Sequence, residues 1–155
     1  MRNWGSSQYG GIATYYKGFF SYLEEGLSVE EAFEAMGFDP PEIKPKKFEE
    51  IKNEVLPEII ETVLEVLVED VECEDWECVG HKAKMIAKLA RAKTIDHILK
   101  AQRDLAWDLW GAVSTIAESA FDWEPEIDDV DIAIACILLT LHYGVKESSF
   151  KGFAT

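Results

Sequence analysis

Carboxylates recur at helical spacing in the middle of this sequence, and they are the residues with the clearest capacity for chemistry. Glu54, Glu58, Glu61 and Glu65 follow one another at intervals of four, three and four, which places them on one face of a helix. Like charges this close repel, so solvent, a basic partner or a metal ion must offset them. Hard cations such as Mg²⁺ prefer oxygen ligands and keep several waters, so two or three carboxylates suffice. A solvated face, a paired face and a magnesium site are therefore the three interpretations.

A second acidic group precedes the last apolar segment of the chain. It consists of Glu124, Glu126, Asp128, Asp129 and Asp131. Acidic side chains at a helix N-terminus interact favourably with the backbone N–H groups that lack an intrahelical partner. We therefore expect this group to stabilise the start of a helix.

Within that group, Glu126-Ile-Asp-Asp129 resembles the ExxD motif of the all-α, MazG-like nucleotide pyrophosphohydrolases. Their partner motif is EExxE on a preceding helix, and Glu58-Ile-Ile-Glu61 supplies an ExxE. The resemblance implies a metal site formed by these four carboxylates, which must then lie within a few ångström of one another. It also implies Mg²⁺-assisted attack of water on a nucleoside triphosphate, with the metal neutralising phosphate charge.

Cys73, Cys78 and His81 place three soft ligands within nine residues. Such a set is compatible with a zinc site, although the cysteines are not spaced as CxxC and no fourth ligand is evident. A redox pair, a loop disulfide and ordinary free thiols are the alternatives. Cys136 falls in an apolar segment, where a buried small hydrophobic residue is expected.

Aromatic residues broaden the apolar face of one expected helix. Trp107, Trp110 and Phe121 extend an apolar stripe over a wide arc, when each residue turns the helix by about 100°. Such a helix is either buried on two sides or meets a partner chain. Tryptophan is enriched at interface hot spots, so these three residues are candidate interface positions.

The charge of the chain is strongly negative but unevenly distributed. Thirty acidic residues against fifteen basic ones give a net charge of −15, which counts against direct nucleic-acid binding. Residues 81–103, by contrast, carry seven basic side chains and one acidic one. Within them His81, Lys84, Lys88 and Arg91 form a stripe at intervals of three, four and three, which could face the acidic helix. The acidic surface could also mimic nucleic acid and bind a basic protein.

Length and hydropathy indicate the general class of protein. The 155 residues fit one domain, and no apolar run reaches the ~18 residues typical of a membrane span. The N-terminus lacks a signal-peptide pattern and the three cysteines are an odd number, so we expect a cytoplasmic protein without membrane association. Scarce Asn and Gln beside abundant Glu are compatible with a thermophilic source.

Hydrophobic periodicity predicts an all-α domain, a bundle of five or six helices. The expected parts are a flexible tail over 1–11, a helical domain over 12–143 and a loose tail over 144–155. The domain divides into a helical hairpin over 12–37 and a main bundle over 47–143. The expected helices cover 12–25, 28–37, 47–70, 81–121 with a break near Lys93-Thr94, and about 125–143.

Three segments are ambiguous from the sequence. Residues 71–80 have no clear period and are expected to form a loop. Pro57 should either kink its helix or restart it. Residues 132–139 are apolar all round, which fits a buried helix or a strand; we favour the helix, because no other segment offers a strand to pair with.

These observations lead to one leading hypothesis of function and two alternatives. The leading hypothesis is a helical interaction module that self-associates or joins a larger assembly. The alternatives are the Mg²⁺-dependent pyrophosphohydrolase and the acidic nucleic-acid mimic. No cofactor is expected apart from Mg²⁺ in the enzyme alternative.

Overall fold

The computed structural model describes residues 10–153, and these residues form eight helices and no strand. The all-α prediction is confirmed, whereas the predicted count of five or six helices is wrong. In chain order the helices are α1 (Gly10–Glu24), α2 (Val29–Ala35), α3 (Phe48–Glu72), α4 (Trp76–Ala90), α5 (Ile95–Asp104), α6 (Leu109–Phe121), α7 (Asp129–Tyr143) and α8 (Glu147–Phe150).

One additional helix arises because the expected segment 95–121 is divided in two. α5 ends at Asp104, and Ala106 adopts the left-handed backbone conformation with φ +63°. Asp108 then starts α6, since its Oδ1 accepts a hydrogen bond from the Gly111 N–H at 2.6 Å. The expected break near Lys93-Thr94 is confirmed, with Thr94 capping α5.

The segment 71–80, expected to be a loop, is mostly helical. α3 continues to Glu72, and α4 begins at Trp76 with Asp75 as its N-cap. The carboxylate of Asp75 accepts a hydrogen bond from the Cys78 N–H, which satisfies a donor in the first turn. Pro57 lies inside α3, which continues through it rather than restarting.

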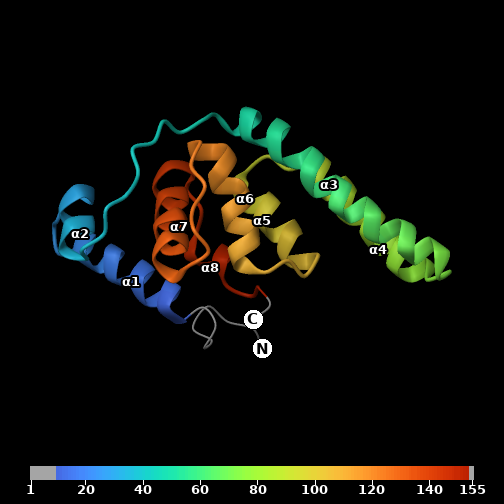
Figure 1. The fold of residues 1–155 in the computed structure, drawn as a ribbon, viewed down its shortest axis with the longest axis horizontal. Helices are drawn as coiled ribbons and strands as arrows, with labels where there is room; N and C mark the ends of the chain where they lie inside the picture. The colour runs from blue at the N-terminus through green and yellow to red at the C-terminus, as the bar shows by residue number, and fades with distance from the viewer. Residues whose placement is uncertain (1–9, 154–155) are drawn as a thin grey trace.

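α7 is the central helix of the body. Residues 132–139 are helical, as favoured from the sequence, and all eight are buried. α1 and α6 both pack against α7 (Figure 1). No helix of residues 10–153 has the length and apolarity needed to cross a membrane.

The C-terminal segment, expected to be loose, packs against this body. Phe150 and Phe153 are fully or almost fully buried, and the Phe150 ring contacts the ring of Tyr16. Arg103 adds a hydrogen bond from its guanidinium to the Lys151 carbonyl at 3.0 Å. Most of the expected N-terminal tail, residues 1–9, lies outside the described residues, and Gly10 already begins α1.

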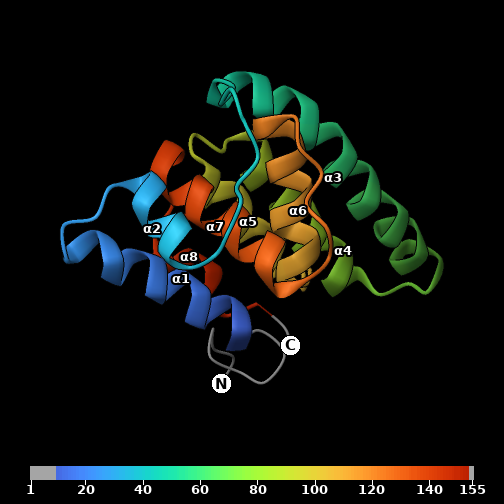
Figure 2. The same cartoon turned by 60° about the vertical axis from the view of Figure 1, so that its left-hand side comes forward.

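α3 and α4 form an antiparallel hairpin that projects from the body, as both views show (Figures 1 and 2). At its base Lys52 donates hydrogen bonds to the carbonyls of Ala90 and Ala92, which places a cation at the C-terminal end of α4. Near its tip Lys82 forms an ion pair with Asp70. Both ends of the hairpin are therefore fixed, but only its base contacts the body.

A polar contact joins the base of α3 to α6. Glu54 accepts a hydrogen bond from the Ser119 hydroxyl at 2.6 Å and another from the Lys46 ammonium at 3.0 Å. The Ser119 hydrogen bond, followed by that of Lys46, lowers the pKa of Glu54. The Lys46 carbonyl also accepts a hydrogen bond from the Tyr143 hydroxyl, so α3 begins at a fixed place on the body.

The buried C-terminal segment gives the first testable prediction. Phe150→Ala should lower the free energy of unfolding by about 3–5 kcal/mol, because it removes a large buried side chain. Urea unfolding measures the change. Ser148→Ala, an exposed site on the same helix, is the control and should stay within about 0.5 kcal/mol. Equal effects of the two substitutions would show that the segment does not dock.

The contact of Glu54 gives the second prediction. Because the folded pKa of Glu54 is lowered, its contribution to stability is present above the unfolded value near 4.5 and is lost as the pH falls through the folded pKa. Urea unfolding of Glu54→Gln at several pH values should show a smaller loss of stability on acidification than the wild type. Ser119→Ala should reduce the loss as well, since it removes the main donor. Parallel curves for all three proteins would contradict this role.

Candidate functional site

The structure does not bring together the four carboxylates of the expected magnesium site. Glu58 and Glu61 lie on α3, in the projecting hairpin, whereas Glu126 and Asp129 lie at the start of α7. Within residues 10–153, no group of three or more His, Cys, Asp or Glu side chains is arranged to hold a metal ion. The four carboxylates therefore do not form the metal site that the resemblance to the MazG-like family implies.

The acidic residues before α7 have structural roles instead. Asp128 caps the helix by accepting a hydrogen bond from the Asp131 N–H at 2.8 Å, and Asp131 accepts one from the Glu126 N–H at 2.8 Å. Asp129 lies against α1, where its carboxylate occupies the space that a Cβ on Gly11 would need. The expectation that this group stabilises a helix start agrees with these contacts.

Cys73, Cys78 and His81 lie around the tip of the hairpin. Cys73 ends α3, and the other two are in the first turns of α4. Both cysteines are free thiols here, and together with His81 they do not form a group that could hold a metal. The hydrogen bond with Asp75 is the main cause that raises the pKa of the Cys78 thiol. Cys136 is buried in α7, as expected.

The three aromatic residues proposed as an interface pack against the chain's own core. Phe121 is buried, with its ring near those of His142 and Tyr143. Trp107 and Trp110 are half-buried against the same core. Trp107 lies in the segment between α5 and α6, so the single helix on which the wide apolar arc was expected does not exist. An interface role for the exposed parts of the two tryptophans stays a prediction.

The acidic and basic stripes of the hairpin do not pair with each other within one chain. Lys82 and Asp70 form the ion pair that links α3 to α4 among the described residues, and neither belongs to the predicted stripes. The hairpin therefore presents an acidic α3 and a basic α4. α3 carries nine acidic residues and one basic one, whereas α4 carries three lysines and one glutamate.

Exposed apolar side chains concentrate on the distal half of this hairpin. Of the seven exposed large hydrophobic residues between residues 10 and 153, five lie between positions 64 and 76. Leu64, Val68 and Val71 are 45%, 53% and 39% exposed, and their spacing of four and three places them on one face of α3. Trp76, at the tip, is 62% exposed. We call these four residues the hairpin face.

Sequence reasoning missed the hairpin face. Trp76 fell in a segment without a clear period, and no exposed apolar face was predicted for the helix that carries Leu64 and Val68. The signal that could have found them is the apolar content of 60–72, which exceeds what one contact with α4 can bury.

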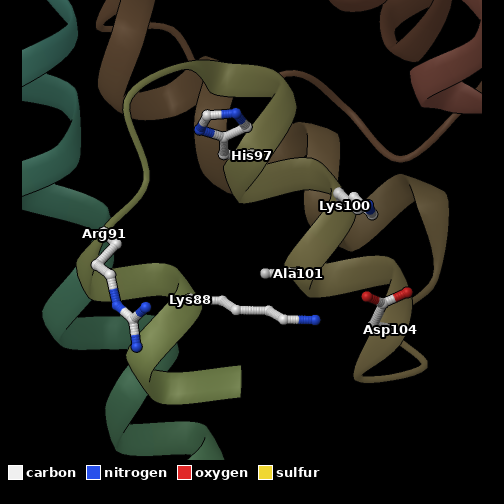
Figure 3. A pocket seen from close by; sticks show the side chains of 6 residues that line it. All are labelled: Lys88, Arg91, His97, Lys100, Ala101 and Asp104. Carbon is white, nitrogen blue, oxygen red and sulfur yellow. The ribbon is translucent and has the colours of Figure 1, made fainter. Parts of the chain in front are cut away.

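A second feature that sequence reasoning missed is a pocket at the base of the hairpin, between α4 and α5 (Figure 3). It has a volume of about 230 Å³, and its lining residues are Lys88, Arg91, His97, Lys100, Ala101 and Asp104. The net charge of +6 over residues 81–103 was the available signal, but the lining comes from two helices whose packing the sequence does not specify.

Comparisons with known protein families, curated proteins and solved structures gave no match to this chain.

The three thiols yield a prediction about reactivity with a disulfide reagent. Cys73 should react fastest because it is exposed, and Cys78 more slowly because its pKa is raised and less thiolate forms. Burial raises the pKa of Cys136 well above its usual value, so this thiol should react only after unfolding. Reaction with Ellman's reagent, assigned with Cys73→Ser and Cys78→Ser, measures the rates. Labelling of Cys136 in the native protein as fast as Cys73 would contradict its burial.

Proposed function

We propose that this protein is a helical interaction module that self-associates through its α3–α4 hairpin. The observation that carries the proposal is the hairpin face: Leu64, Val68, Val71 and Trp76 stay exposed on helices that project from the body. Contiguous exposed apolar surface commonly marks an interaction site, and the spacing of Leu64, Val68 and Val71 makes their surface continuous along α3. Burying an aliphatic side chain from full exposure contributes about 1.5–3 kcal/mol, and these three are 39–53% exposed, so a partner that covers them gains about half of that for each.

Charge supports a second copy of the chain as the occupant. A two-fold axis would place the acidic α3 of one copy beside the basic α4 of the other, so the same surface serves both copies. Glu61 and Glu65 flank the hairpin face on α3, whereas His81 and Lys84 lie on the distal part of α4. Neither group forms an ion pair within residues 10–153, so both are available to a partner.

The geometry of such a dimer is a familiar one. Two antiparallel hairpins that pack face to face make a four-helix bundle, in which the apolar stripes become the shared core. Trp76 is a suitable anchor, because tryptophan is enriched among the residues that contribute most to binding energy. The body helices then lie outside the interface and keep their own core.

Introducing a charge into the hairpin face tests this proposal. Sedimentation velocity at about 100 µM should show a wild-type dimer, whereas Leu64→Glu and Val68→Glu should be monomers because a charge would be buried in the interface. Val29→Glu, an exposed valine on α2, is the matched control and should leave the dimer intact. Far-UV circular dichroism verifies that each variant is folded.

Salt provides an independent readout of the same proposal. Raising the ionic strength from about 50 mM to 500 mM should weaken the dimer, since charges of α3 and α4 would pair across the interface. A strictly monomeric wild type would overturn self-association, and a dimer that survives Leu64→Glu would place the interface elsewhere.

A further inference from the structure

The pocket at the base of the hairpin has the composition of an anion-binding site. Lys88 and Arg91 reach it from the last turns of α4 (Figure 3). His97, Lys100 and Asp104 reach it from α5, where spacings of three and four place them on one face with Ala101. Two helices that are neighbours in sequence therefore line one hollow with basic side chains.

The lysines and the arginine of this pocket have no anionic partner among the described residues. Within residues 10–153, Lys88, Arg91 and Lys100 take part in no ion pair, even though Asp104 belongs to the same lining. Three like charges around one opening repel, and an anion between them removes that repulsion. In a chain of net charge −15, such a gathering of unpaired cations stands out from the rest of the composition.

His97 is the second, independent observation, because its ring is held in one orientation. Its Nδ1 accepts a hydrogen bond from the Lys93 N–H at 3.0 Å. When Nδ1 accepts, the proton of the neutral ring resides on Nε2, so that nitrogen is a hydrogen-bond donor. The Thr94 hydroxyl, which accepts from the His97 N–H, fixes the backbone of the same residue. His97 therefore offers a neutral N–H donor on a ring that is held in one orientation, and this ring belongs to the same lining as the lysines.

We infer that this pocket binds the phosphate group of a small phosphate monoester. Arginine, lysine and a neutral N–H donor together match the several acceptor oxygens of a phosphate group. The volume of about 230 Å³ leaves room for a phosphate and a few further atoms. Asp104 lies at the side of the pocket toward which the Lys88 chain extends, and its carboxylate would accept a hydrogen bond from a hydroxyl group of the ligand (Figure 3).

Titration of the full-length protein tests this inference. Inorganic phosphate and glycerol 3-phosphate are added at constant ionic strength, and the amide signals of the ¹⁵N-labelled protein are followed by NMR. The expected result is saturable shifts centred on residues 97–104, with glycerol 3-phosphate binding more tightly because its hydroxyls can reach Asp104. Shifts that do not saturate, or that are spread over the surface, would overturn the site.

Matched substitutions distinguish a specific phosphate-binding site from nonspecific electrostatic attraction. Lys88→Gln and Lys100→Gln should each weaken phosphate binding about tenfold, as expected for the loss of one charge-assisted hydrogen bond. Lys47→Gln is the control, because it removes an exposed positive charge that lies outside the pocket lining and forms no ion pair within residues 10–153. Equal weakening by Lys47→Gln would reduce the effect to nonspecific attraction and overturn the inference. A phosphate affinity that is unchanged in both Lys88→Gln and Lys100→Gln would overturn it as well.

Discussion

α7 must be covered by other helices on all sides, and this requirement determines which apolar surfaces of the molecule remain exposed. This helix is apolar around its whole circumference, and its residues 132–139 are buried. α1 and α6 pack against it, and Phe150 and Phe153 complete the apolar body. Helices committed to this core cannot cover the distal half of the hairpin. Leu64, Val68 and Trp76 are exposed because the helices that could cover them already pack against α7.

Much of the fold could be predicted from periodicity and from helix signals. Signals from residues close in sequence predicted the short helix over 28–37, the long helix over 47–70, the break near Thr94 and the buried helix over 132–139. The division between α5 and α6 could not be predicted, because Leu105 and Leu109 continue the apolar spacing across it. The left-handed backbone at Ala106 breaks the helix there without any glycine or proline as a signal.

The candidate sites were harder to predict, since each depends on how helices pack. Asp129, one of the predicted metal ligands, lies against α1 instead, and its neighbour Asp128 caps α7. The basic pocket joins Lys88 of α4 to His97 of α5, and the angle between these helices is set by the core. The C-terminal phenylalanines were too few to give a period, so only the tertiary structure reveals that they dock.

Hydrogen exchange as a function of protein concentration tests the central claim most directly. If a second copy covers the hairpin face, amides of residues 60–86 should exchange more slowly in concentrated than in dilute solution, because association suppresses local opening. Amides of α7 should not change, since that helix is covered within each chain. Exchange in the hairpin that is the same at every concentration would contradict the account.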